Sequence, residues 1–106
     1  DEIGRSALMW AALEDKTDMA HLLIEKGADM NIKDNLNGWT ALMVTVLHGK
    51  RDMASLLIEK GADMNVTDKN GRSALMVAAA LEDKTDMANL LIEKGADMNV
   101  NDNPEG

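Results

Sequence analysis

The sequence contains no cysteine, phenylalanine or tyrosine, and only two tryptophans and one proline. Without cysteine, the chain can form no disulfide bond, no thiolate zinc site and no cysteine nucleophile. Because aromatic side chains are so scarce, the core has to be built from leucine, isoleucine, alanine, valine and the nine methionines. Alanine, leucine and methionine are good helix formers, so the composition predicts an all-α fold.

Basic clusters and long apolar segments are missing as well. Nineteen acidic residues against eleven basic ones give a formal net charge of −8, and no basic run exceeds the pair Lys50–Arg51. Binding a phosphate backbone requires several cations on one face, so we expect no nucleic-acid partner. No apolar run approaches the roughly 20 residues of a membrane span, and no signal-peptide segment opens the chain. We therefore expect no membrane partner and favour an intracellular location.

The main feature of the sequence is an internal repeat. The ten residues LLIEKGADMN occur three times, starting at Leu22, Leu56 and Leu90, which lie 34 residues apart. Aligning the chain on this block divides a single domain into units 1–33, 34–67 and 68–101. Residues 102–106 have the spacing of the start of a truncated fourth unit. The chain also begins without methionine, and we expect it to be processed or cut from a longer one.

Each unit begins with a short helical pattern of the form Gly-x-Ser/Thr-Ala-Leu-Met. The hydroxyl residues Ser6, Thr40 and Ser73 suit the N-cap, because their side chains can accept hydrogen bonds from amides two or three residues further on. Alanine- and leucine-rich stretches of about two turns follow. A first helix is therefore predicted in each unit.

A second helical pattern contains an apolar stripe at positions i, i+3 and i+4. The stripe consists of Met19, Leu22 and Leu23, and it recurs at Met53-Leu56-Leu57 and Met87-Leu90-Leu91. Each copy ends in Lys-Gly, which is typical of a helix end with a left-handed glycine. One such helix pair cannot bury its apolar faces alone, whereas stacked pairs bury one another. The sequence therefore predicts a short α-solenoid.

The repeated blocks are evenly spaced, but the second and third units each carry one extra residue, at a different place in the unit. Relative to the 33 residues of the first unit, the second has one extra residue within Asn35–Asn37. The third has one extra alanine within Ala78–Ala80, at the end of its first helix or in the following loop. An extra residue inside a packed helix rotates everything beyond it by about 100 degrees, whereas a loop absorbs it. We interpret the constant block as the part that stacks.

Over essentially its full length the sequence resembles the ankyrin repeat. In the third unit the matching residues are Asp68-x-x-Gly71-x-Ser73-Ala74-Leu75-Met76 and Leu90-Leu91-Ile92-x-x-Gly95-Ala96-Asp97-x-Asn99. The family's usual proline and histidine are replaced in every unit by alanine (Ala7, Ala41, Ala74) and methionine (Met9, Met43, Met76). Its glycine between the two helices remains only as Gly49, with Asp15 and Asp83 elsewhere. The resemblance implies an α-solenoid of helix-turn-helix units with projecting β-hairpin-like loops.

The resemblance also implies a non-catalytic module that binds a protein partner through its hairpin tips and first helices, which form a concave face. The candidate partner-binding residues on this face are Arg5, Leu36, Trp39, Leu47, His48, Lys69 and Arg72. The second unit differs most from its neighbours here, so Leu36, Trp39 and Leu47 are a candidate apolar patch. The alternative is that Trp39 packs along its hairpin. Trp10, inside the first helix, is expected to be wedged between helices.

No motif for catalysis, a cofactor or a metal accompanies the repeat. The sequence has no phosphate-binding glycine loop, no cofactor fingerprint and no Ser/His/Asp set with a supporting context. The Asp/Asn-rich turns fail as calcium loops, because placing Gly71 at position 6 puts Val66 and Val77 at ligand positions. The resemblance further marks Asn31, Asn65 and Asn99 as candidates for asparaginyl hydroxylation, and the alternative is that this asparagine has only a structural role in the turn.

Two further expectations concern the whole array. Near-verbatim units leave open an engineered, consensus-like scaffold with no natural ligand, or a recent tandem duplication, although the unequal second unit argues against an idealised design. Neither end carries an obvious polar cap. Because the last unit repeats the stripe Met87-Leu90-Leu91 with no continuation to cover it, we expect fraying or end-to-end self-association there.

Overall fold

The computed structural model describes residues 4–81 and 85–96 of the chain. This part contains six α-helices and no strand, which confirms the predicted all-α fold. The helices are α1 (Ala7–Leu13), α2 (Thr17–Glu25), α3 (Ala41–Leu47), α4 (Arg51–Glu59), α5 (Ala74–Ala80) and α6 (Thr85–Glu93). Each predicted unit thus holds one helix pair. None of these helices is long and apolar enough to cross a membrane.

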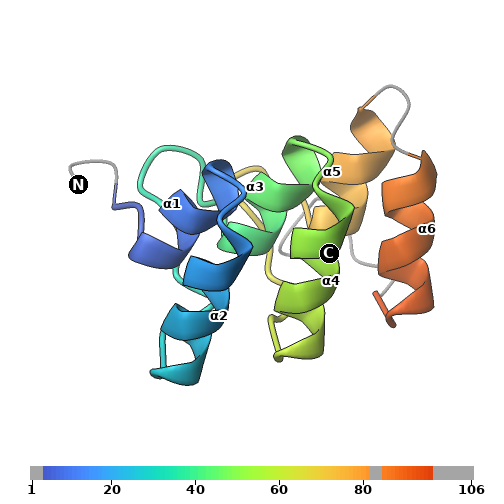
Figure 1. Ribbon diagram of the computed structural model, residues 1–106. Coiled ribbons are helices and arrows are strands. Elements are labelled where there is room, and N and C mark those ends of the chain that lie inside the picture. Colours follow the sequence, from blue (N-terminus) through green and yellow to red (C-terminus); the bar gives the residue numbers. More distant parts are fainter. Residues whose placement is uncertain (1–3, 82–84, 97–106) are drawn as a thin grey trace.

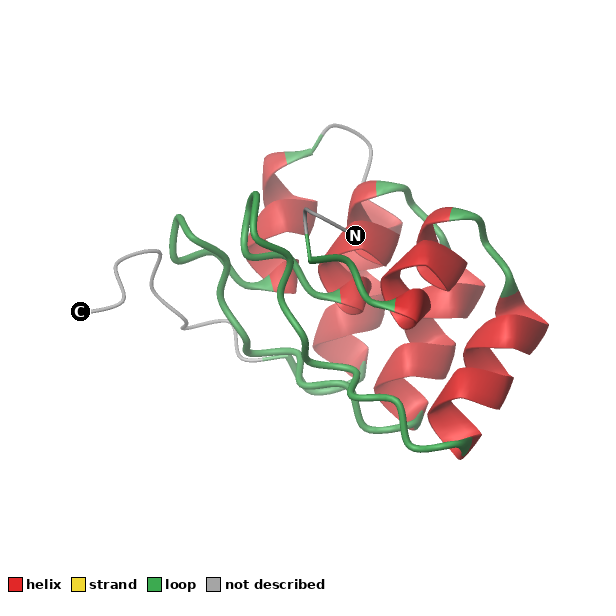
Figure 2. Ribbon diagram, turned by 90° about the vertical axis from the view of Figure 1, so that its left-hand side faces the viewer, coloured by secondary structure: helices red, strands yellow, loops and turns green. Residues whose placement is uncertain are grey.

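The three helix pairs stack in chain order. Each odd-numbered helix packs against the even-numbered helix that follows it, and α3 lies between α1 and α5 (Figure 1). The loops that join one pair to the next project away from the helices on one side (Figure 2). The solenoid therefore presents a row of loops beside a row of first helices.

The first helices begin as the sequence predicts. The side chains of Ser6, Thr40 and Ser73 accept hydrogen bonds from the amides three residues further on, at 3.1, 3.3 and 3.4 Å. Each hydroxyl thereby satisfies one of the amides that a helix start leaves without an intrahelical partner. The exchange of proline for alanine at the next position leaves this cap in place in all three units.

The second helices end in the same turn in each unit. Gly27, Gly61 and Gly95 have φ angles of +92°, +104° and +101°, in the left-handed region that favours glycine. After α4, the amide of Gly61 donates to the carbonyl of Ile58 at 3.0 Å, and the amide of Ala62 donates to Leu57 at 2.9 Å. This pair of hydrogen bonds is a Schellman motif, and it confirms the predicted glycine end.

The turn between the two helices of a pair also needs a left-handed residue. Gly49 supplies it in the second unit with a φ of +69°, and Asp15 adopts a φ of +55° in the first. Aspartate tolerates this region better than most residues, so the departure from glycine is accommodated as predicted. Asp83, the counterpart in the third unit, lies outside the described residues.

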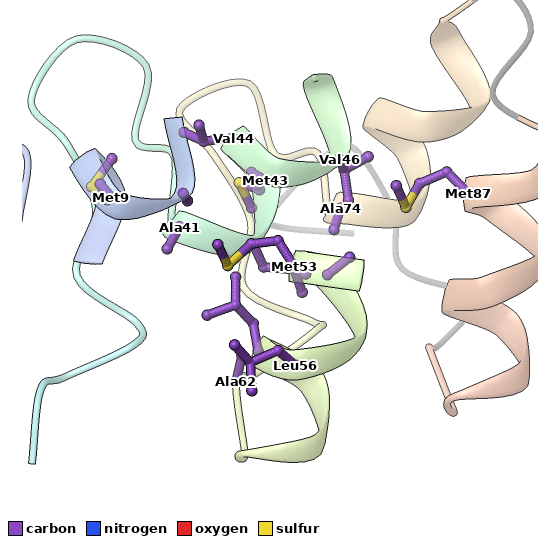
Figure 3. Packing of buried hydrophobic residues seen from close by; sticks show 14 of the residues in the cluster. Met9, Ala41, Met43, Val44, Val46, Met53, Leu56, Ala62, Ala74 and Met87 are labelled. Atoms are coloured by element: carbon purple, nitrogen blue, oxygen red, sulfur yellow. The ribbon is translucent and has the colours of Figure 1, made fainter. Parts of the chain in front are cut away.

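The core is aliphatic and rich in methionine. Met9, Met43, Met53 and Met87 are almost completely buried between the helices (Figure 3). Figure 3 also shows small residues such as Ala41 and Ala74 where the helices approach one another closely. The methionines at the family's histidine position therefore contribute buried thioether surface in the first two units.

The predicted location of the uncovered stripe is wrong. In α4 and α6, Met53 and Met87 are only 0% and 2% exposed, whereas Met19 in α2 is 49% exposed. A position that is buried in the second and third units and exposed in the first must face the preceding unit. The apolar stripe therefore points toward the start of the array, and it is covered at the last unit and open at the first.

The prediction that Trp10 is wedged between helices is wrong for the same reason. Its counterparts Val44 and Val77 are buried against the unit before them, but Trp10 is 42% exposed and is not wedged between helices. The first unit has no described unit in front of it to cover this position.

The structure shows where the two extra residues go. In the second unit the amide of Asp34 donates to the carbonyl of Trp39 at 2.9 Å, whereas in the third that of Asp68 donates to Arg72 at the same distance. The second hairpin therefore encloses one more residue. In the third unit α5 has seven residues, like α1 and α3, and four residues rather than three separate it from α6. Both extra residues fall in loops.

Candidate protein-interaction surface

The hairpin of the second unit is organised by a buried carboxylate. Asp34 is only 5% exposed, and its Oδ1 accepts hydrogen bonds from the amides of Asn37 (2.9 Å), Gly38 (2.9 Å) and Trp39 (3.1 Å). Three donors to one carboxylate oxygen fix the backbone around it. Leu36 lies inside this held loop, and its side chain is 61% exposed. The loop thus displays an apolar side chain on an ordered backbone.

A second buried carboxylate joins this hairpin to the next one. The Nε1–H of Trp39 donates to Oδ2 of Asp68 at 3.2 Å, and Arg72 Nε lies 3.4 Å from the same oxygen. The other oxygen of Asp68 accepts from the amides of Asn70 (2.8 Å) and Arg72 (3.0 Å). Trp39 and Arg72, both predicted site residues, are therefore brought together around Asp68. Half-buried Trp39 therefore links the hairpins of the second and third units.

Lys69 connects the same two hairpins from the outside. Its backbone amide donates to the carbonyl of Asn37 at 2.9 Å, and its exposed ammonium donates to the carbonyl of Asn35. Gly38 lies directly against Lys69, because a Cβ at Gly38 would be only 2.9 Å from the Lys69 backbone nitrogen. A larger residue would not fit at this position. Contacts from the third unit therefore hold the residues on both sides of Leu36.

The remaining predicted residues lie apart from this hairpin pair. Leu47 and His48 stand at the C-terminal end of α3, and a helix of seven residues places them about 10 Å from its start. His48 Nδ1 contacts the Val44 carbonyl at 2.9 Å, which requires the proton on that nitrogen. Leu47 is half-buried. The structure thus separates Leu47 from Leu36 and Trp39 along the first helix instead of gathering them in one place.

Arg5 belongs to the first unit and faces Trp10. Its guanidinium carbon lies 5.0 Å from the centroid of the Trp10 ring, within the range of a cation–π contact. The seven predicted residues therefore form three groups. These are the hairpin group (Leu36, Trp39, Lys69, Arg72), the end of α3 (Leu47, His48) and Arg5.

The two aspartates that organise the hairpins were not predicted as site residues. Asp34 and Asp68 each open a unit, and the neighbouring asparagines and glycines indicate only a turn. Gly38 follows Asp34 by four residues, and Gly71 follows Asp68 by three. The sequence signal that could have identified these aspartates is an acidic residue three or four positions before a turn glycine. The side chain of such a residue can accept hydrogen bonds from the turn amides.

The constant block LLIEKGADMN forms contacts between neighbouring units. These contacts agree with its interpretation as the part that stacks. The side-chain oxygen of Asn31 accepts from the Asp63 amide of the next unit at 3.0 Å. A Cβ at Gly61 would lie 3.7 Å from Cε of Met30, so this methionine packs on the turn of the following unit. Asn99 lies outside the described residues. Among the residues that the structure describes, no group of three or more acidic or histidine side chains could hold a metal ion.

Comparisons with known proteins identify this arrangement. The sequence matches the family model described as ankyrin repeats (3 copies) over residues 8–102. The structure is similar to the ankyrin repeat domain of Bcl-3, described as a unique member of the IkappaB protein family, with a TM-score of 0.84 and 31% sequence identity. The match covers 89% of this chain and 41% of the Bcl-3 chain. A comparison with curated proteins found no match. Three copies in phase over most of the sequence show that the chain belongs to the ankyrin-repeat family.

Proposed function

We propose that the chain is a non-catalytic module that binds a protein partner through its hairpin tips and first helices. Ankyrin repeats are generally protein-interaction modules. The proposed surface is supported by the loops between the helix pairs, which project from the helices on one side (Figure 2). The observation that carries the proposal is Leu36, which is 61% exposed on a backbone fixed by Asp34. Leu36 is the main contact that we assign to the partner.

An ordered hairpin is well suited to binding. A loop that is already held in one conformation loses little conformational entropy when a partner docks on it. The exposed ammonium of Lys69 lies beside Leu36 along the hairpin, because it contacts the carbonyl of the preceding residue, Asn35. This combination favours a partner segment that places an apolar side chain next to an acidic one.

The test is capture of a partner followed by titration with matched variants. Leu36→Ser removes the exposed apolar side chain, and we expect it to weaken binding by about tenfold or more. Lys60→Ser is the control, because it replaces an exposed side chain on the second-helix layer of the middle unit, away from the hairpins and from both ends of the array. Equal affinities of Leu36→Ser and the unmodified chain, or equal losses in both variants, would contradict the proposed surface.

The identical blocks support a second candidate, an engineered scaffold without a natural ligand. A sequence selected only for folding is expected to return no saturable partner and to melt at a high temperature, above about 90 °C. A thermal melt recorded beside the capture experiment separates the two candidates. A saturable partner whose binding depends on Leu36 excludes the scaffold.

A further inference from the structure

The start of the array carries an uncovered apolar surface, which we call the leading face. It consists of Ala7 and Trp10 of α1 with Met19 and Leu22 of α2, and all four side chains are exposed. The same positions in the second unit, Ala41, Val44, Met53 and Leu56, are buried against the first unit. Three of the four residue types are identical between these two sets.

The end of the array carries the surface that would cover a leading face. This trailing face consists of Leu75, Met76, Ala79, Ala88 and Ile92, which are exposed or half-buried in the third unit. The corresponding residues of the first unit are Leu8, Met9, Ala12, Ala20 and Ile24, and the first four are completely buried beneath the second unit. All five residue types are identical between the two sets. The chain therefore exposes both halves of an interface that it already forms internally.

We propose that a second copy of this chain docks its leading face on the trailing face of the first, so that the solenoid continues from one molecule to the next. The internal contact between the first two units supports this docking, because it uses the same side chains in the same positions, except that Trp10 takes the place of Val44. The two faces are different surfaces, so the contact is heterologous and does not close on itself. Further copies can add at both ends of the growing assembly.

Oppositely charged residues at the edges of the leading and trailing faces are complementary as well. Within the chain, Lys94 at the end of α6 lies 3.2 Å from Glu59 at the end of α4. Lys26 and Glu93 hold the corresponding positions at the two ends of the array, and both are exposed. Head-to-tail docking brings this pair together across the contact. The net charge of −8 opposes association over a longer range, so added salt should strengthen it.

Two complementary variants test the proposal by sedimentation velocity at concentrations from about 10 µM to about 1 mM. The first, Met19→Glu with Leu22→Glu, blocks the leading face. The second, Ala79→Glu with Ile92→Glu, blocks the trailing face. All four positions are exposed, so the variants should keep the far-ultraviolet circular dichroism of the helices. Lys60→Glu, at an exposed position of the middle unit, is the control, because it also makes the net charge more negative by two.

We expect the unmodified chain and the Lys60→Glu variant to gain mass with concentration. Each blocked variant should stay monomeric, with association weakened about 100-fold or more, because docking would bury unpaired carboxylates. An equimolar mixture of the two blocked variants should form a dimer, since one keeps its trailing face and the other its leading face. A monomeric unmodified chain at about 1 mM would overturn the proposal. Self-association of either blocked variant alone, or a mixture that forms no dimer, would overturn the head-to-tail arrangement.

Discussion

The hydrogen bond between Trp39 and Asp68 should contribute measurably to stability. Trp39→Phe removes the indole N–H that donates to Asp68 Oδ2 at 3.2 Å. A hydrogen bond to a charged group contributes about 1.5–3 kcal/mol, and this distance is at the long end of the range, so we take about 1.5 kcal/mol. The smaller ring also loses partly buried surface, which costs about 0.5 kcal/mol more. The expected loss in free energy of unfolding is about 2 kcal/mol.

A double-mutant cycle with Asp68→Asn isolates the hydrogen bond from the packing. In the asparagine background the carboxylate is gone, so Trp39→Phe should cost only the packing part, about 0.5 kcal/mol. The expected coupling between the two positions is therefore about 1 to 1.5 kcal/mol. Leu36→Ala serves as the control, since that side chain is largely exposed and should change stability little.

Urea unfolding followed by circular dichroism at 222 nm measures the cycle. With a slope of about 1 to 1.5 kcal/mol per molar urea, a loss of 2 kcal/mol lowers the midpoint by roughly 1.5 M. Dilute protein keeps association between copies from contributing. A coupling below about 0.3 kcal/mol would mean that Trp39 and Asp68 act independently. Trp39 would in that case be a surface side chain and not a link between units.

Three other variants probe the contacts and the loop between the second unit and its neighbours. Asn31→Ala removes the acceptor for the Asp63 amide, so it should cost about 0.5–1 kcal/mol and speed hydrogen exchange at Asp63; unchanged exchange would contradict the link. Deleting Leu36 shortens the hairpin to the length found in the third unit, so it should lower stability by less than about 0.6 kcal/mol in urea unfolding. Deleting Ser55 inside α4 should unfold the chain, because the residues beyond it rotate by about 100 degrees; similar midpoints for the two deletions would contradict the placement of the insertion.

Much of the fold could be predicted because the same local sequence signals occur in each of the three units. The hydroxyl N-caps, the left-handed glycines and the tolerance of Asp15 for a left-handed backbone all depend on residues close in sequence. The extra residue within Asn35–Asn37 was placed in a loop by comparing spacings alone. These features need no knowledge of how one unit lies on the next.

The direction of stacking could not be predicted from the pattern. Periodicity shows that Met19, Met53 and Met87 share one apolar face, but it does not say whether the preceding or the following unit covers that face. The prediction that the apolar stripe of the last unit is uncovered was wrong for this reason. The hydrogen bond from Trp39 to Asp68 was missed for a similar reason, since it joins residues 29 positions apart in different units.

Methionine oxidation can establish whether the second helices pack toward the start of the array. Met19, Met53 and Met87 occupy the same position in the three second helices, and they are 49%, 0% and 2% exposed. Brief treatment of dilute protein with peroxide, read by peptide mass spectrometry, should oxidise Met19 about tenfold or more faster than the other two. Reaction of Met87 at the rate of Met19, or equal rates at all three positions, would show that the stripe is not covered by the preceding unit.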